Sequence, residues 1–349
     1  MKKRIAVIGY GGQGAWHCDR IMQSSTCLLA GVFDIKEDRN LIAKKKGIYI
    51  YQSVSSILTD CTVSVVIIAT PNNSHAELAI KALNAGKHVI CEKPATISVS
   101  EFDQILETSR KTKCFFTAFQ NRRWDVDFLS LKNASNSYIL GEVIRIESRV
   151  HGSRGIPNDW RREKLQGGGM VLDWGVHLID QILQIISSKV TRVYCTTTYI
   201  TNTEVEDGFR LELTFADGKS ALIEVGTYNF LSMPRFYMLC SCGTILLQDW
   251  RAPAKAVKLV RWEESDATPI QNASGITKTM APRDEKTIEE FYLPIPTNNV
   301  DEYYQNFFDA IDGKIANPIV RCEEIRRVLQ IIEMAFESAA TGKVINSNM

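Results

Sequence analysis

The feature that most constrains this chain is a run of spaced glycines close to its N-terminus. An apolar, β-branched stretch at residues 5–8 leads into Gly9, Gly11 and Gly14, and a helical pattern of polar and apolar residues follows. At this spacing the first glycine permits a tight turn, the second lets the backbone approach a bound group, and the third lets the helix pack closely on the strand. Unpaired N–H groups and the positive dipole end of such a helix attract an anion. The stretch therefore predicts a strand–turn–helix unit that binds the pyrophosphate of a dinucleotide.

An acidic residue stands where the same kind of unit recognises a ribose. Asp34 ends the second predicted strand, about 20 residues beyond the glycine turn, which also includes Gly12 and Gln13. A carboxylate there accepts a hydrogen bond from the ribose 2′-hydroxyl of NAD and repels the 2′-phosphate of NADP. Lys36 and Arg39 follow closely and could offset part of that repulsion, although a solvated helix start explains them equally well. We expect the cofactor to be NAD, with NADP the less favoured alternative.

The composition is that of a globular protein with about two domains. A chain of 349 residues exceeds a single ordinary core, and its 45% hydrophobic and 23% charged residues are typical of folded domains. The net charge of +1, without a long run of one sign, argues against nucleic acid and anionic membranes as partners. The charged start of the sequence leads directly into the first predicted strand, and the apolar runs are too short to span a bilayer. The nine cysteines are scattered along the sequence. We expect a cytoplasmic protein with reduced thiols and no metal site.

Strand and helix patterns alternate through the first part of the chain. Besides the glycine unit, we expect helices at 36–46, 74–86 and 98–111, strands at 63–69, 88–91 and 114–119, and a weak strand near 48–52. Capping boxes that pair Ser74 with Glu77 and Ser98 with Glu101 would start the last two helices. This alternation predicts right-handed crossovers in a doubly wound parallel sheet, with the cofactor loops at the carboxyl ends of its strands.

The pattern changes after residue 121. We expect helices at 125–134, 169–186, 301–311 and 323–340, and strands at 142–150, 190–200, 209–215, 220–228 and 237–247. Residues 251–296 carry no clear pattern. The predicted fold class is α/β, with a doubly wound Rossmann domain at residues 1–121. An α+β domain with a largely antiparallel open sheet follows at residues 122–349.

Lys93 is the first candidate for chemistry. It follows the predicted strand at 88–91, between Glu92 and Pro94, so it lies where a strand end faces the cofactor crevice. Pro94 restricts the backbone that leaves the strand, and an X–Pro bond is able to adopt the cis form. The ordinary alternative is a solvated surface lysine. Facing the crevice, Lys93 would instead hold a substrate hydroxyl and take part in proton transfer.

Asp173 and His177 form the second candidate group. They are spaced i and i+4 in a predicted helix that follows three glycines at 167–169, so they share one face, with Asp180 one turn further on. An unperturbed imidazole has a pKa of about 6.5 and exchanges a proton readily at neutral pH. A buried structural histidine is the common alternative, but the acidic neighbour and the glycines favour a functional one. His75, at a helix start beside a cofactor loop, is expected to be structural or close to the cofactor.

Four motifs, taken in order, resemble the Gfo/Idh/MocA oxidoreductases, a family that includes glucose–fructose oxidoreductase and the inositol dehydrogenases. They are the glycine unit, Ala69-Thr-Pro-Asn72 with His75, Glu92-Lys93-Pro94 and Asp173-x-x-x-His177. The likeness spans nearly the whole chain. Asn121-Arg-Arg-Trp124 and the pair Trp160-Arg161 look most like the branch that contains scyllo-inositol dehydrogenases.

The resemblance implies an activity and roles for the three candidate residues. Hydride would pass between the nicotinamide of NAD and a ring carbon of a sugar or cyclitol. His177 would be the principal acid and base, Lys93 would bind the reacting hydroxyl and help to deprotonate it, and Asp173 would orient the substrate. The open C-terminal sheet would form the interface of a homodimer or homotetramer.

The resemblance also implies roles for residues around the centre. Glu92 would support the nicotinamide end of the cofactor. Three residues would line its pyrophosphate and nicotinamide ribose: Thr70, Pro71 and Asn72. Three further residues are weaker candidates for the substrate rim: Arg123, Trp160 and Arg161. A surface or structural role is an equal alternative for each of them.

Two other functions are compatible with such a fold. A regulator that senses NAD(H) without catalysis would need neither Lys93 nor His177, so their presence argues against it. Some relatives of the family use NAD transiently to cleave glycosidic bonds without net oxidation, and no motif of this chain selects that route.

Overall fold

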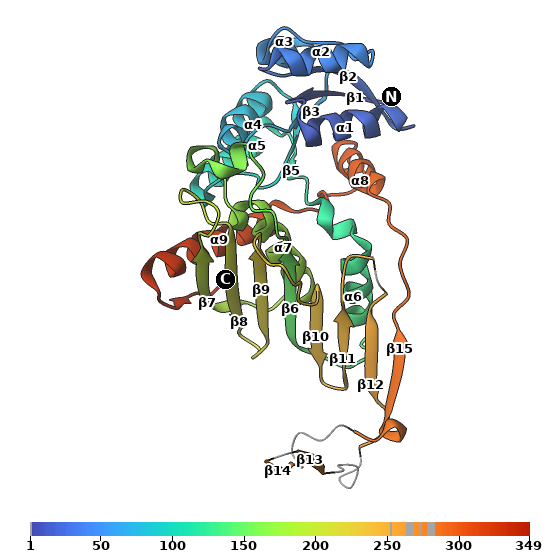
Figure 1. The fold of residues 1–349 in the computed structure, drawn as a ribbon. Coiled ribbons are helices and arrows are strands. Elements are labelled where there is room, and N and C mark those ends of the chain that lie inside the picture. The colour runs from blue at the N-terminus through green and yellow to red at the C-terminus, as the bar shows by residue number, and fades with distance from the viewer. Residues whose placement is uncertain (1, 252, 263–268, 273, 278–282) are drawn as a thin grey trace.

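Two sheets organise the protein (Figure 1). The computed structural model describes residues 2–251, 253–262, 269–272, 274–277 and 283–349. The first sheet has five parallel strands from the N-terminal third of the chain, and the second has nine mostly antiparallel strands. The predicted fold class is confirmed. Among the described residues, no helix combines the length and the apolar character needed to cross a bilayer.

Parallel pairing buries the first sheet on both faces. Its strand order is β2-β1-β3-β4-β5, and every residue of β3 is buried. Strands buried on both faces have continuous apolar runs instead of alternating patterns, as in β3, whereas the edge strand β2 leaves Leu28 exposed. The strands are β1 (Lys3–Ile8), β2 (Cys27–Phe33), β3 (Val65–Ile68), β4 (His88–Cys91) and β5 (Phe116–Ala118).

The helices of this part of the fold follow the prediction with two differences. The short helix α3 was not expected, and the predicted weak strand near 48–52 is a single bridge between Ile50 and Val32. A lone bridge forms because only one residue of that loop reaches the edge strand β2. The helices are α1 (Gly12–Gln23), α2 (Glu37–Lys45), α3 (Val54–Thr59), α4 (His75–Asn84) and α5 (Val99–Thr112).

One of the two predicted capping boxes is wrong. A 3₁₀ turn, Asn72–Ser74, precedes α4, and the Ser74 hydroxyl donates to the Pro71 carbonyl instead of accepting from the helix. The other box is half formed, because Ser98 accepts from the Glu101 N–H as expected, whereas the Glu101 carboxylate accepts from the Ile97 N–H.

The second sheet has the order β15-β12-β11-β10-β6-β9-β8-β7-β16, in which β6 and β9 pair in parallel and the other neighbours are antiparallel. The predicted strand at 237–247 is two strands, because the chain turns at residues 241–242 and pairs with itself. The unpatterned region 251–296 supplies β12 and β15 at one edge. The strands are β6 (Val143–His151), β7 (Val190–Thr198), β8 (Gly208–Phe215), β9 (Ser220–Gly226), β10 (Phe236–Cys240), β11 (Gly243–Leu247), β12 (Lys255–Leu259), β15 (Ile288–Tyr292) and β16 (Ile345–Asn346). A separate pair contains β13 (Ile270–Asn272) and β14 (Gly275–Thr277).

Helices α6 (Val126–Asn136), α7 (Val176–Ile185) and α9 (Cys322–Thr341) pack against one face of this sheet (Figure 1). The described residues thus form two cores. The predicted boundary near residue 121 lies at the 3₁₀ turn Asn121–Trp124, between them. The division of the chain into domains at that point stays a prediction.

One helix crosses back to the first core. α8 (Asp301–Ile311) follows β15 in the chain but lies beside α1, and it buries Tyr303, Tyr304, Phe307 and Phe308 in the N-terminal core (Figure 1). Each aromatic side chain removes a large apolar surface from water, so this packing contributes strongly to stability. The assignment of the whole segment 122–349 to a separate second domain therefore does not describe the packing of α8.

Candidate active site

One cleft of about 1800 Å³ extends from the glycine turn after β1 to the start of α7. It lies beyond the carboxyl ends of β1, β3 and β4, the usual position of a ligand in a doubly wound sheet. The cleft brings together most of the residues singled out in the sequence. They are Gly9, Gly11, Gly12, Gln13, Asp34, Thr70, Pro71, Asn72, Glu92, Lys93, Trp160, Arg161, Asp173 and His177.

The glycine turn has the geometry that a pyrophosphate requires. Gly9 has a φ of +92°, in the region that favours glycine. A Cβ on Gly14 would lie 2.0 Å from the Gly9 carbonyl oxygen, so no larger residue fits where α1 meets β1. A Cβ on Gly11 or Gly12 would meet nothing within 4 Å. The space above the turn is therefore open for a ligand, and the chain fits a dinucleotide there.

The Asp34 carboxylate is held beside the turn. It accepts hydrogen bonds from the Tyr10 N–H at 2.6 Å and from the Lys36 N–H at 2.8 Å. These backbone donors set its position at the end of β2, where a carboxylate meets an adenosine ribose. Lys36 and Arg39 also line the cleft, so both are close to where a 2′-phosphate would lie.

Glu92 belongs to a buried chain of hydrogen bonds that sequence reasoning missed. Its carboxylate is 2.9 Å from His17 Nε2, and His17 Nδ1 is 2.6 Å from the Tyr304 hydroxyl. The same carboxylate accepts from the Lys93 N–H at 3.2 Å. His17 was not singled out in the sequence, and its partner in α8 is 287 residues away. The chain of bonds fixes the backbone from which Lys93 projects.

Lys93 and Asp173 meet across the cleft. Lys93 Nζ donates to Asp173 Oδ1 and to the Asp173 carbonyl oxygen, both at 2.7 Å, and the Lys93–Pro94 bond is cis. Arg161 Nε lies 3.4 Å from the other carboxylate oxygen. Burial opposes the charge on Asp173, but Lys93 and Arg161 outweigh it and hold the pKa of this carboxyl below its ordinary value. Asp173 is therefore an anion that orients the lysine ammonium.

The segment that carries Asp173 is not the regular α-helix that the spacing predicted. Residues Val171–Gly175 form a turn of π-helix, and α7 begins only at Val176. A π turn holds one more residue than an α turn and is frequent at functional sites. The Asp173 carbonyl of this turn accepts a hydrogen bond from Lys93 Nζ.

His177 is buried at the base of the cleft, with 4% of its surface exposed. Its Nδ1 has no hydrogen-bond partner within the part of the chain that the structure describes. Burial, followed by the charges of Lys93, Arg122 and Arg235, lowers its pKa well below the ordinary 6.5. The imidazole is consequently neutral at pH 7 and able to accept a proton. Neither Arg122 nor Arg235 was singled out in the sequence.

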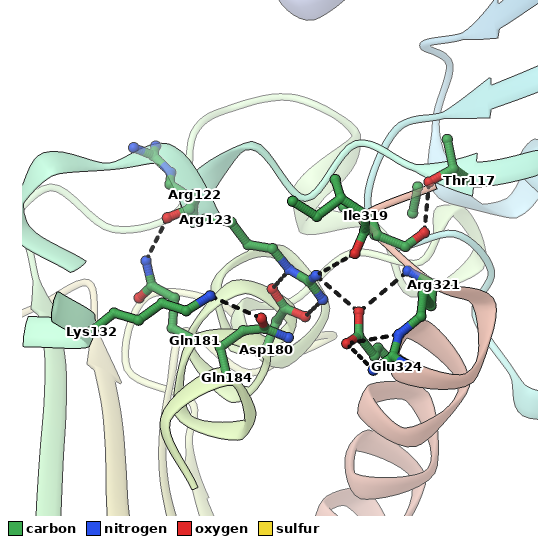
Figure 2. Close-up of polar contacts among 12 residues, drawn as sticks. Thr117, Arg122, Arg123, Lys132, Asp180, Gln181, Gln184, Ile319, Arg321 and Glu324 are labelled. Atoms are coloured by element: carbon green, nitrogen blue, oxygen red, sulfur yellow. Dashed lines mark hydrogen bonds and ion pairs between the residues drawn. The ribbon is translucent and has the colours of Figure 1, made fainter. Parts of the chain in front are cut away.

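Arg123 does not reach the cleft, so its prediction as a rim residue is wrong. Figure 2 shows it between α7 and α9, where its Nε donates to Asp180 at 2.7 Å and its Nη1 to Glu324 at 2.9 Å. Both Arg123 and Asp180 are buried. The preceding residue, Arg122, lines the cleft instead. The turn Asn121–Trp124 directs the two arginines to opposite sides, which a sequence motif does not show.

His75 is a structural residue, which is one of the two roles expected from the sequence. Its ring nitrogens lie 2.8 Å from the Pro94 carbonyl oxygen and 2.9 Å from the Thr70 carbonyl oxygen. It is fully buried and is absent from the residues that line the cleft, so of the two alternatives the structure favours the structural one. The imidazole instead joins the loops that carry Thr70 and Lys93. Burial lowers its pKa.

Metal chemistry has no candidate group in this region. Within the ranges that the structure describes, no cluster of three or more His, Cys, Asp or Glu side chains is arranged to hold a metal ion. All nine cysteines are described and none is in a disulfide.

The fold and the cleft define a class, the dinucleotide-dependent oxidoreductases, in which cofactor loops face a group able to take a proton. Two family models then match the chain. A model described as an oxidoreductase family with an NAD-binding Rossmann fold matches residues 3–119, and the Gfo/Idh/MocA C-terminal domain matches residues 128–246. Together they cover more than half of the sequence, and the chain belongs to the Gfo/Idh/MocA oxidoreductases. Its cofactor class, NAD, agrees with the prediction from Asp34.

Individual relatives support the same placement. An NAD-binding protein from Listeria innocua of known structure is 42% identical, with a TM-score of 0.95, and the match covers 99% of each chain. An uncharacterized oxidoreductase of Schizosaccharomyces pombe is 37% identical over 51% of this chain and 50% of that protein. A myo-inositol 2-dehydrogenase of Thermotoga maritima is 32% identical over 58% of this chain and 60% of that protein. The chain thus spans about half to three fifths of the length of these two curated relatives.

Proposed function

We propose that this protein is an NAD-dependent dehydrogenase that oxidises a CH–OH group on the ring of a sugar or cyclitol, or reduces the corresponding ketone. The observation that carries the proposal is the contact of Lys93 with Asp173, 80 residues apart in the chain, beside a neutral His177 in the cleft that holds the glycine turn. The Thermotoga relative is named a dehydrogenase of a cyclitol, which supports the same substrate class.

His177 is proposed as the proton acceptor in the oxidising direction. A neutral imidazole is a competent base, whereas an imidazolium is not, and the lowered pKa keeps it neutral. After it accepts the proton, the positive charges of Lys93, Arg122 and Arg235 favour its release. His177 is therefore suited to pass the proton onward instead of retaining it.

Lys93 and Asp173 are proposed to position the reacting hydroxyl. The ammonium of Lys93 donates to the hydroxyl oxygen and stabilises negative charge that develops on it as the proton leaves. Asp173 holds this ammonium from two atoms, and its second carboxylate oxygen is available to a neighbouring hydroxyl near Arg161. NAD, when bound, supplies the hydride acceptor. Trp160 and Arg161 lie at the rim, with the Arg161 guanidinium 4.7 Å from the centre of the Trp160 ring.

The assay is a panel of polyols and ring sugars with NAD, in which reduced cofactor is followed by absorbance. We expect Lys93→Ala and His177→Ala each to lower kcat by about 10²- to 10⁴-fold, while both variants still bind NAD, since one removes the cation that stabilises the developing charge and the other removes the proton acceptor. Lys111→Ala, which removes an exposed lysine paired with Glu107, is the matched control and is expected to keep its rate.

Three results would contradict the proposal. Wild-type turnover in both site variants would show that these residues take no part. Turnover of an aryl glycoside with catalytic NAD, without net formation of reduced cofactor, would instead establish the glycosidase route. A protein that binds NAD tightly and turns over neither class of compound would be a sensor.

We further propose a cytoplasmic homodimer or homotetramer that pairs through the open face of the second sheet. Exposed apolar side chains on its strands support this, among them Ile144 on β6 and Leu246 on β11, which are 45% and 37% exposed. Sedimentation velocity tests it. Ile144→Arg is expected to lower the oligomer mass, and an unchanged mass would exclude that face.

A further inference from the structure

A second hollow opens beside the active-site cleft. This hollow, the side pocket, has a volume of about 590 Å³ and lies among the ends of β6 and β9 and the residue Trp250. It shares two lining residues with the main cleft, Arg122 and Trp174. Trp174 adjoins Asp173 in the same π turn, so the side pocket begins next to the reacting centre.

The two hollows differ in charge. Acids and bases both line the main cleft, whereas the side pocket is lined by Arg122, Arg154 and His151 and, within the described ranges of the chain, by no Asp or Glu. His151 is already engaged, because Nε2 lies 3.0 Å from a Glu224 carboxylate oxygen and Nδ1 accepts from the Met233 N–H. The positive charge that faces the side pocket therefore comes from its two arginines.

Both arginines retain donors for a ligand. Arg122 uses Nη1 for a 3.2 Å contact with Asp125, its side chain is 34% exposed, and no described residue is hydrogen-bonded to its Nη2. Arg154 is exposed, and no hydrogen bond or ion pair joins its side chain to another part of the chain that the structure describes. Behind the two arginines, the buried Asp127 carboxylate lies 3.2 Å from Arg235, so the opposite charges of these two side chains offset each other.

Two aromatic rings lie beside the Arg122 guanidinium. Its centre is 4.9 Å from the Trp174 ring and 5.7 Å from the Trp250 ring, and the two ring centres are 5.7 Å apart, so the three groups form a triangle. The N–H edge of a guanidinium matches the two oxygens of a carboxylate or phosphate. Trp174 and Trp250 also offer apolar surface to the part of a sugar that carries no hydroxyl.

We propose that the side pocket is a substrate subsite for an oxyanion, a carboxylate or a phosphate carried by a sugar or cyclitol substrate, bound by Arg122 and Arg154. The inference depends on the function proposed above and narrows its substrate class to an acidic sugar derivative. The anionic substituent would lie between the two arginines while the ring carbon to be oxidised stays at Lys93 and His177.

The first experiment compares three probes that share one ring: D-glucose, D-glucuronate and D-glucose 6-phosphate, each with NAD. We expect kcat/KM for one of the charged probes to exceed that for glucose by about tenfold or more, since a charge-assisted hydrogen bond is gained. The preferred charged probe identifies the oxyanion. Arg154→Gln is expected to lower the ratio of charged to neutral kcat/KM by about tenfold. Arg192→Gln, at an exposed arginine on β7, is the matched control and should leave the ratio unchanged.

The second experiment separates failure of this inference from failure of the proposed function. Calorimetric titration of NAD-saturated protein with inorganic phosphate and with acetate measures anion binding without turnover, and the glycine turn is then already filled. Weaker binding in Arg154→Gln than in Arg192→Gln supports the subsite even if no sugar is oxidised. Sugar oxidation with an equal ratio in the wild type and Arg154→Gln would overturn the subsite and leave the dehydrogenase intact. Thermal unfolding of each variant checks that it is folded.

Discussion

Replacement of Arg123 tests whether the two cores are joined by a buried ionic contact. Arg123 follows the last strand of the first sheet, Asp180 lies on α7 and Glu324 on α9, so one guanidinium joins three elements (Figure 2). Burial by itself would lower the pKa of Arg123, but Asp180 and Glu324 raise it above its ordinary value, and the side chain stays charged. The variant Arg123→Met keeps an apolar stem of similar size and removes the charge.

The expected magnitude follows from burial. Asp180 is 2% exposed, so loss of its partner leaves a carboxylate in an environment that water does not reach. Removal of one member of a buried pair costs about 3–5 kcal/mol of folding free energy. Since Asp180 lies three residues after His177 on α7, a loosened α7 also moves the proton acceptor, and we expect kcat to fall.

Urea denaturation of the purified protein measures this change in the free energy of unfolding. Arg326 provides a matched control, because it contacts Asp103 through the same two guanidinium nitrogens, with Nε also at 2.7 Å, but the two side chains are 36% and 46% exposed. Arg326→Met should change stability by no more than about 1 kcal/mol. The double variant Arg123→Met with Asp180→Leu should recover most of the loss, because it removes the unpaired charge. If Arg123→Met cost no more than Arg326→Met, the argument from burial would be refuted.

Three further predictions concern the cofactor turn and the proton acceptor. Gly14→Ala should destabilise the protein and abolish NAD binding, because its Cβ would lie 2.0 Å from the Gly9 carbonyl oxygen. Gly11→Ala should keep its Tm and bind NAD more weakly. Equal losses of Tm in the two variants would contradict this prediction. Asp34→Ser should shift the ratio of kcat/KM toward NADP, because the 2′-phosphate no longer meets a carboxylate. Steady-state kinetics with both cofactors measure this ratio, and an unchanged ratio would contradict the prediction. As the pH falls, oxidation is lost only when His177 gains a proton, so kcat/KM should stay level through pH 6.5 and decline only at lower pH. A decline centred at pH 6.5 or higher would disprove the lowered pKa of His177.

The candidate site could be predicted from the sequence wherever its parts are local. Gly9, Gly11 and Gly14 lie within one strand–turn–helix unit, whose meaning depends on backbone sterics over a few residues. Lys93 could be placed in the cleft because every parallel strand of the first sheet ends at the same edge. The length and type of α8 and α9 were also predicted, because amphipathic periodicity is a local property.

Other features depend on contacts between distant residues and were missed. The sequence left Arg123 as one of three rim candidates, with a surface or structural role as an equal alternative. Asp180 and Glu324 bind Arg123 in a structural role, whereas its neighbour Arg122 lines the cleft. The expected strand at 237–247 became two strands because its second half folds back onto its first.

Local sequence patterns were enough to predict the class of protein: a parallel dinucleotide-binding sheet, its NAD turn and a lysine and a histidine suited to proton transfer. The behaviour of those groups depends on the folded chain. It sets Lys93 against Asp173, returns α8 to the first core and surrounds His177 with cations that lower its pKa. The physical reason is that backbone geometry is encoded by neighbouring residues, whereas burial and electric potential are sums over groups that only the folded chain brings together.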